Sequence, residues 1–352
     1  MRMLLLLLGL LLLPCAPAAE ALRVLIIGNS YTFYNNLPAV LEALSRKTAC
    51  PLEVSSYTAG AMSLHSFLTM PRHAKARQMV ESGQFDWVIL QDQSQTPAFK
   101  PEETLSSVQQ WCSIARRSRT KVLLFLTWAH ASRQGNALLP MLDMQERTSS
   151  TYCRAALQNK ARVAPAGEAW AAWHRRKPEI SLYDKDGSHP NPTGTYLTAC
   201  VLHASISGKA LKNLPGTLRA GGRTLISLPA TTARELQKTA NSTLKSFTPE
   251  SWLQKQEQKS AARPSVDNIR QALRKDMNIK ELMQLAGKPV MVTSHGGRKT
   301  YQFQLRNNAE LCAYCSPQGQ IQQVSIATPG QMAEIIDLQL TIGNPVKTMQ
   351  LD

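Results

Sequence analysis

The segment 23–33 constrains the fold of this chain more than any other part of the sequence. Residues 24–27 read Val-Leu-Ile-Ile, and Gly28, Asn29 and Ser30 follow directly. A continuous apolar run of this kind is typical of a parallel strand that is buried on both faces. Because open α/β sheets bind ligands at the carboxyl ends of their strands, Ser30 is a candidate nucleophile near a helix N-terminus that favours negative charge. The alternative is an ordinary turn and helix cap, where all three residue types are common.

Strand and helix patterns alternate along residues 22–247. After the first strand, apolar runs that are typical of strands begin near Leu52, Phe85, Lys121 and Arg162. Helical patterns separate these runs, and the main ones cover 37–47, 101–117, 142–158, 193–207 and 229–247. The alternation predicts an α/β domain with a doubly wound parallel sheet. Residues 221–224 are expected to form a loop.

The N-terminus has the pattern of an export signal. A short charged segment and the apolar run 4–13 are followed by small residues, which predicts a signal peptide over residues 1–21. The run is too short to span a bilayer, so we expect no transmembrane span and an exported protein, either periplasmic or extracellular. Pro14 precedes Cys15 and fits a lipid-attachment box poorly, so we do not expect a lipoprotein anchor.

The C-terminal third reads as a separate unit. Residues 248–265 are polar and rich in Lys, Gln and Ala, which is typical of a linker. Residues 266–328 show two short helical patterns and then three strand patterns joined by turn residues, which predicts a small α+β domain. Residues 329–352 are expected to form a tail.

The formal charge of +16 suggests an anionic partner. The basic residues are scattered and no nucleic-acid motif accompanies them, so we expect no nucleic-acid partner. A solvated basic surface explains the charge, and an acidic polysaccharide is the most sensible specific partner.

Without Cys15, six of the seven cysteines remain, a number compatible with disulfides or with isolated buried thiols. We favour a structural role for Cys312 and Cys315, because residues three apart on a strand face opposite ways.

The segment 184–196 carries the strongest chemical signal. Asp186 precedes His189 by three residues in a proline-stiffened loop before a helix. A carboxylate on the far nitrogen of a histidine holds that base in the required tautomer. A calcium loop starting at Asp184 is excluded, because it lacks the third oxygen ligand and the terminal glutamate of an EF-hand. We expect neither a metal nor a cofactor.

Four motifs in this order resemble the SGNH/GDSL hydrolase superfamily, most closely its secreted bacterial members. They are Gly28–Thr32, Gly60, Gln91–Gln95 and Asp186–Pro190, and the resemblance covers about residues 22–247. The resemblance implies a flavodoxin-like sheet of the SGNH hydrolase type.

The resemblance also implies a catalytic triad. Ser30 matches the nucleophile of the superfamily, His189 its general base and Asp186 the acid that orients the base. The implied activity is that of a serine esterase that removes acetyl or similar groups from an acylated small molecule or glycan. Two alternatives remain open: an O-acyltransferase on the same triad, and a non-catalytic cell-envelope protein that binds glycans.

The oxyanion hole implied by the resemblance has three donors. They are the N–H groups of Ser30 and Gly60 and an amide side chain. The asparagine that is usual in the third of these motifs is absent from Gln91–Gln95, and Gln95 takes its place by position, with Gln93 as the alternative. The alternative for Gly60 is a turn glycine without a role in the oxyanion hole.

Two residues after the fourth predicted strand are further candidates. Trp128 and His130 are expected either to line the pocket or to be a core tryptophan and a loop histidine.

Near the C-terminus, Leu282–Pro289 and Thr300–Tyr301 resemble the small module of outer-membrane assembly lipoproteins. That resemblance implies a module that docks an envelope partner.

Overall fold

The computed structural model describes residues 20–134, 137–274, 276–306, 309–328 and 334–337. Almost all of the predicted signal peptide and most of the predicted tail therefore lie outside the described residues. The chain divides into two compact units, residues 1–247 and 248–352, and each is described by itself. None of the described helices is long and apolar enough to cross a membrane.

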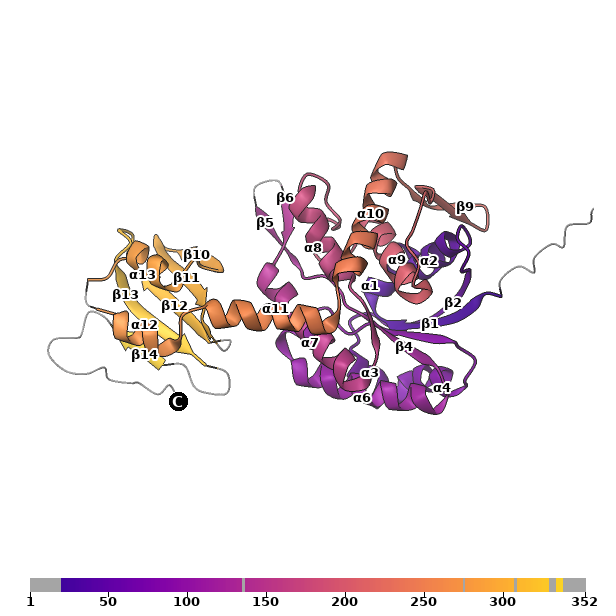
Figure 1. Cartoon of the computed structure of the whole chain (residues 1–352), viewed down its shortest axis with the longest axis horizontal. Coiled ribbons are helices and arrows are strands. Elements are labelled where there is room, and N and C mark those ends of the chain that lie inside the picture. The colour runs from indigo at the N-terminus through magenta and orange to yellow at the C-terminus, as the bar shows by residue number, and fades with distance from the viewer. Residues whose placement is uncertain (1–19, 135–136, 275, 307–308, 329–333, 338–352) are drawn as a thin grey trace, which may run out of the picture. The chain divides into compact units, whose positions relative to one another are not determined.

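The first unit is built on a five-stranded parallel sheet in the order β2-β1-β3-β4-β7 (Figure 1). Its strands are β1 (Leu22–Gly28), β2 (Leu52–Thr58), β3 (Trp87–Leu90), β4 (Lys121–Phe125) and β7 (Arg162–Ala164). In chain order this is the 2-1-3-4-5 arrangement of doubly wound, flavodoxin-like folds. The predicted fold class is confirmed.

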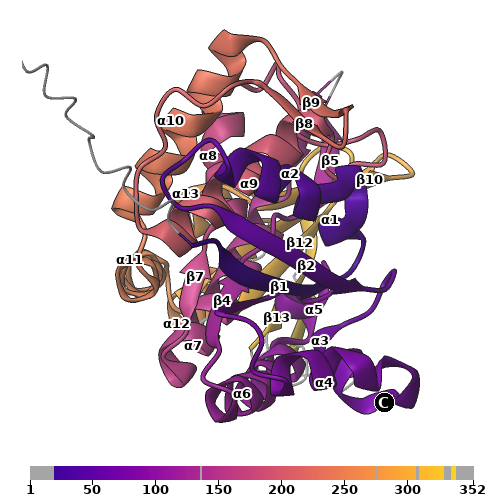
Figure 2. The same ribbon diagram turned by 90° about the vertical axis from the view of Figure 1, so that its right-hand side faces the viewer.

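Two apolar cores cover the two faces of the sheet. Val24 and Ile26 of β1 belong to one core, whereas Leu25 and Ile27 belong to the other, and all four are fully buried. The continuous apolar run therefore arises because both faces are covered. Figure 2 shows one helix layer on each side of the sheet. One layer consists of α2 (Leu37–Ser45), α8 (Ala166–Arg176), α9 (Pro192–Ser207) and α10 (Ala230–Ser246). The other layer consists of α3 (Leu64–Thr69), α4 (Ala74–Glu81), α6 (Pro101–Arg117) and α7 (Leu142–Asn159).

Short elements extend this framework at the strand ends. They include α1 (Ser30–Phe33), η1 (Tyr34–Asn36), η2 (Pro71–His73) and α5 (Thr96–Phe99). Two hairpins were not expected: β5 (Ala131–Gln134) with β6 (Ala137–Pro140), and β8 (Thr217–Ala220) with β9 (Arg223–Ser227). The loop expected at residues 221–224 is in fact a tight hairpin turn. Gly221 and Gly222 both have positive φ, which is the requirement of a two-residue turn between paired strands.

In its described residues, the second unit holds three helices and a five-stranded antiparallel sheet. The helices are α11 (Pro249–Ala262), α12 (Val266–Ala272) and α13 (Ile279–Ala286). The strands are β10 (Met291–His295), β11 (Arg298–Gln304), β12 (Glu310–Cys315), β13 (Ile321–Ala327) and β14 (Glu334–Asp337). A small α+β domain was predicted, but β10 and β14 were not, and β14 lies within the expected tail.

Most of the segment that was expected to be a linker forms helix α11. Thr248 caps this helix, and its side chain accepts a hydrogen bond from N of Ser251. The reason lies in the composition, because Lys, Gln, Glu and Ala are strong helix formers. The described residues contain six cysteines and none of them forms a disulfide, so neither this unit nor the first is held by a disulfide there.

Candidate active site

The side chains of the predicted triad lie in contact at the carboxyl edge of the parallel sheet. Ser30 follows β1, whereas Asp186 and His189 lie in the loop before α9. Nε2 of His189 is 2.9 Å from Oγ of Ser30, although 159 positions separate the two residues. Nδ1 of His189 is 2.5 Å from Oδ2 of Asp186. The geometry allows a proton to pass from the hydroxyl to the ring, with a carboxylate behind the ring.

The turn at the end of β1 leaves the N–H of Ser30 available as a donor. A Cβ atom on Gly28 would lie 2.5 Å from Oε1 of Gln91, so only glycine fits there. Asn29 is the N-cap of α1, and its Oδ1 accepts a hydrogen bond from N of Tyr31. Ser30 is therefore the first residue of a helix, a position whose N–H has no intrahelical partner.

Asp186 holds His189 through both of its carboxylate oxygens. While Oδ2 contacts the ring, Oδ1 accepts hydrogen bonds from N of Ser188 and from N of His189, each at 2.9 Å. Burial disfavours the ionised carboxylate, but the hydrogen bonds from the ring and from the two backbone groups outweigh it. The pKa of Asp186 therefore lies below its usual value. An ionised Asp186 only accepts, so it keeps a proton on Nδ1 and leaves Nε2 free to accept from Ser30.

Two tyrosines fix the plane of the His189 ring. The ring of Tyr34 stacks on the imidazole with centroids 4.4 Å apart and planes inclined by 19°. Tyr31 meets the imidazole edge-on at 5.8 Å. Oη of Tyr34 donates to Oδ2 of Asp184 at 3.3 Å, which ties it to the loop that carries the histidine. An aromatic face attracts a cation, so the ring of Tyr34 is placed to interact with an imidazolium that forms during a proton transfer. Neither tyrosine was given a role from the sequence, although Tyr31 lies within the first motif.

Trp128 and His130 have different environments. Trp128 is fully buried and stacks between Tyr31, at 4.6 Å, and Trp170, at 3.9 Å. Of the two expectations for Trp128, the core tryptophan is confirmed and the pocket residue is wrong, because Trp128 belongs to the core beneath the site. His130 is half-buried, and its Nε2 atom lies 3.3 Å from Oγ of Ser188, the residue before the triad histidine.

Gly60 lies in an exposed loop between β2 and α3 that is anchored near its C-terminal end. Nδ2 of Asn29 donates to O of Met62 at 3.0 Å, and N of Leu64 donates to Oδ1 of Asp92 at 2.8 Å. Within the described part of the chain, no hydrogen bond occupies the N–H of Gly60. Gly60 can therefore donate to a substrate, as an oxyanion-hole glycine must.

Gln93 is held more firmly than Gln95. Oε1 of Gln93 accepts hydrogen bonds from N of Gln95 at 2.7 Å and from N of Thr96 at 3.1 Å. Because its oxygen is fixed at the start of α5, its NH₂ group is fixed in the opposite direction, where it lies 3.4 Å from Oγ of Ser94. The side chain of Gln95 is exposed and makes no hydrogen bond to the described residues. Oxyanion donors act through preorganisation, so the geometry favours Gln93 over Gln95.

The two glutamines can be separated by substitution. Gln93→Ala is expected to lower kcat for an aryl acetate by about 10²–10³-fold with little change in KM, because an oxyanion donor acts mainly in the transition state. Gln95→Ala is expected to leave kcat close to that of the wild type. Steady-state kinetics on both variants, with Gln110→Ala on the exposed face of α6 as the matched control, provide the test. A large loss in Gln95→Ala alone would reverse the assignment.

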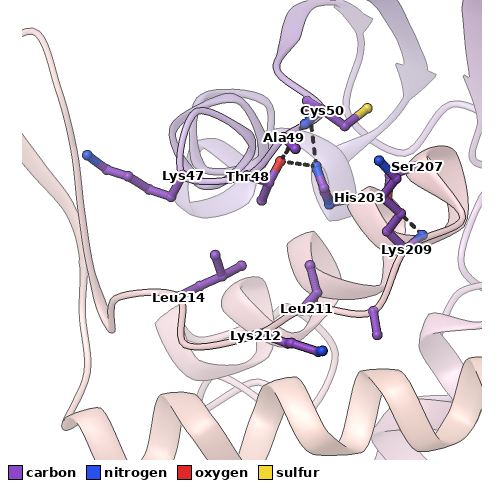
Figure 3. A pocket seen from close by; sticks show the side chains of 11 residues that line it. Lys47, Thr48, Ala49, Cys50, His203, Ser207, Lys209, Leu211, Lys212 and Leu214 are labelled. Atoms are coloured by element: carbon purple, nitrogen blue, oxygen red, sulfur yellow. Dashed lines mark hydrogen bonds between the residues drawn. The ribbon is translucent and has the colours of Figure 1, made fainter. Parts of the chain in front are cut away.

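A pocket of about 200 Å³ lies at the opposite edge of the sheet (Figure 3). It opens between the loops that follow α2 and α9, and its lining includes Thr48, Cys50 and His203. Nε2 of His203 lies 3.0 Å from Oγ1 of Thr48. Burial lowers the pKa of His203 and raises that of the Cys50 thiol, so both are uncharged at neutral pH. None of its described lining residues carries a carboxylate, and the pocket therefore lacks the acid–base pair found at the triad.

Comparisons with known proteins agree with this architecture. No protein-family model matches the sequence, and no curated protein is significantly similar to it. Among solved structures, a DUF4886 family protein from Bacteroides uniformis ATCC 8492 is 15% identical, covers 64% of this chain and 96% of its own, and has a TM-score of 0.53. A proposed SGNH hydrolase from Slackia heliotrinireducens is 27% identical over 53% of this chain and 100% of its own, with a TM-score of 0.45.

A third similar structure is that of the acetyl xylan esterase AlAXEase. It is 15% identical, covers 52% of this chain and 99% of its own, and has a TM-score of 0.43. The TM-score with the Bacteroides protein shows that this chain and that protein share a fold. SGNH and GDSL proteins are also among the solved structures that were found in this comparison.

Proposed function

We propose that this protein is an exported serine esterase of the SGNH type that removes acetyl groups from carbohydrate. The observation that carries the proposal is the continuous contact from Asp186 through His189 to Ser30. A serine in hydrogen-bond contact with a histidine that is itself oriented by a carboxylate has the arrangement of an activated nucleophile. The available N–H groups of Ser30 and Gly60 and the amide of Gln93 would complete the site.

The first half of the reaction forms an acyl-enzyme. Nε2 of His189 takes the proton of Ser30 as Oγ attacks the ester carbonyl, and the oxyanion donors stabilise the tetrahedral intermediate. Asp186 and the ring of Tyr34 stabilise the imidazolium that forms. The imidazolium then gives its proton to the leaving sugar oxygen, and the C–O bond of the ester breaks.

The second half regenerates the enzyme. His189 removes a proton from water, the resulting hydroxide attacks the acyl carbon, and the proton returns to Ser30 as acetate leaves. Replacing water by a sugar hydroxyl would make the same site a transferase. Release of free acetate, measured with and without added sugar acceptor, separates the two reactions.

The accessibility of the triad supports a bulky alcohol as the leaving group. The side chains of His189 and Asp186 are 26% and 45% exposed, so the base can be reached from solvent. A polymer chain can therefore lie across the site without being threaded into a closed cavity. The test is acetate release from an acetylated oligosaccharide and from an aryl acetate by the same enzyme, with Ser30→Ala as the control. Hydrolysis of the aryl ester without any hydrolysis of acetylated sugars would contradict the carbohydrate substrate.

We propose that the second unit docks an envelope partner or a surface polymer and takes no part in the chemistry. All groups assigned to the reaction lie in residues 22–247, which have their own cores. A chain that ends at Phe247 is therefore expected to fold and to hydrolyse a small aryl acetate with a kcat close to that of the full chain. Melting curves and kinetics on the two chains check this. A truncated protein that melts cooperatively but is inactive on the small ester would contradict it.

A further inference from the structure

A series of hydrogen-bonded side chains lies beside the triad, and of its members only Gln93 takes part in the steps above. Oη of Tyr31 is 2.8 Å from Oγ of Ser188, which in turn is 3.3 Å from Nε2 of His130. The same Nε2 atom is 3.1 Å from Oγ of Ser94. Nε2 of Gln93 donates to that Oγ at 3.4 Å. His130 therefore lies between two arms of hydrogen-bonded side chains. Ser188 and Tyr31 form one arm, and Ser94 and Gln93 form the other.

The arms end on the segments that carry the proposed catalytic groups. Tyr31 directly follows the nucleophile, Ser188 directly precedes the general base, and Ser94 directly follows the favoured oxyanion donor. These three segments come from different places in the sequence, after β1, before α9 and after β3. His130 comes from a fourth segment, after β4, and joins the other three.

The backbone around His130 is fixed from two sides. Its carbonyl oxygen accepts a hydrogen bond from N of Met141 at 2.9 Å, and its N–H contacts Sδ of Met144 at 3.4 Å, at the start of α7. On the other side, N of Ala131 donates to O of Gly187 at 2.7 Å, in the loop that carries the triad acid. Because the backbone that carries the His130 side chain is fixed, the side chain can hold its hydrogen-bond partners in place.

The ring of His130 is suited to link hydroxyl groups without disturbing the charge of the triad. Burial lowers its pKa, with a smaller lowering by His189 and an opposing effect from Asp186. The ring is therefore neutral at neutral pH. Nε2 of a neutral ring offers one lone pair or one N–H, which the hydroxyl groups of Ser94 and Ser188 share. Such a ring places no second positive charge beside the imidazolium that the reaction creates.

From this arrangement we infer that His130 is a positioning residue. It holds Ser94 and Ser188 in place. Through them, it keeps the oxyanion donor and the general base in the correct position relative to the nucleophile. The inference deepens the proposed esterase function and rests on it. It predicts that His130 affects the rate of the chemical step and not the binding of substrate.

Two substitutions test this inference. His130→Leu keeps most of the volume but has no polar atom, whereas His130→Gln places an amide close to the position of Nε2. His130→Leu is expected to lower kcat by about tenfold at unchanged KM, because two hydroxyl groups lose their common partner. His130→Gln is expected to restore most of kcat. An unchanged kcat in His130→Leu, or a change confined to KM, would overturn the inference.

A double-mutant cycle tests whether the effect passes through Ser188. If it does, the variant that combines His130→Leu with Ser188→Ala should be no slower than the slower single variant. Losses that multiply would contradict the inference. If melting curves show that His130→Leu does not fold, Ser94→Ala and Ser188→Ala carry the test, because each removes one of the two contacts of His130. Each variant is then expected to lower kcat at unchanged KM, and an unchanged kcat in both would contradict the inference.

A spectroscopic readout separates this inference from the proposed function. In protein labelled with nitrogen-15 histidine, the ring signals of His189 are expected to shift in His130→Leu but not in His65→Gln, a substitution on the exposed face of α3. A shift in an enzyme that hydrolyses no ester would count against the esterase and support the positioning role. Unshifted signals in an active enzyme would count against the positioning role alone.

Discussion

Replacing Ser30 by alanine is expected to lower kcat for an aryl acetate by at least about 10⁴-fold. The loss is this large because no other hydroxyl is in contact with Nε2 of His189 among the described residues. The melting temperature should stay close to that of the wild type, since the backbone turn that carries Ser30 is fixed by Gly28 and Asn29.

The matched control for this substitution is Ser106→Ala, on the exposed face of α6. This variant should keep wild-type kinetics, which shows that the loss belongs to Ser30 and not to the removal of a hydroxyl as such. Residual activity within about tenfold of the wild type, in protein free of wild-type contamination, would mean that another group is the nucleophile.

Asp186→Asn is expected to lower kcat by about 10³–10⁴-fold without unfolding the protein. The amide oxygen can keep both backbone hydrogen bonds that Oδ1 now accepts from Ser188 and His189. The NH₂ group must then face Nδ1 of His189, where the carboxylate oxygen lies now. An NH₂ group donates, so the proton of the ring moves to Nε2, which can no longer accept from Ser30.

Kinetics and melting curves on Asp186→Asn check this, and Asp143→Asn in an exposed ion pair on α7 is the matched control. A variant of Asp186 that loses activity only because it melts near the assay temperature would not support the argument. Full activity in a folded Asp186→Asn protein would show that His189 does not need the carboxylate to set its tautomer.

The fold of the first unit followed from the sequence because its signals are local. The run at 24–27 is apolar at each position since both faces of β1 are covered, and the helices that cover them carry clear apolar patterns. The two hairpins were missed because their strands are only four or five residues long, too short for a periodic pattern. The helix α11 was missed because polar composition was taken to mean a linker, although the same residues favour helix.

For the candidate site too, the features that depend on local spacing were predicted from the sequence, and those that depend on contacts between distant residues were not. Asp186 and His189 were found because they are three positions apart in one rigid loop, a spacing that can be read directly. The choice between Gln93 and Gln95 could not be made in this way, because it depends on which amide oxygen meets the start of α5. The position of His130 depends on contacts with Ser94 and Ser188, which are 36 and 58 positions away in the sequence.

The assignment of Ser30 as the nucleophile is tested most directly by the site at which a serine-reactive fluorophosphonate labels the full chain. The probe forms a covalent bond only with an activated serine hydroxyl, and mass spectrometry of the digested protein locates the adduct. We expect a single adduct on Ser30, formed rapidly in the wild type and abolished in His189→Ala. A folded wild-type protein that remains unlabelled, or an adduct on a different serine, would contradict it.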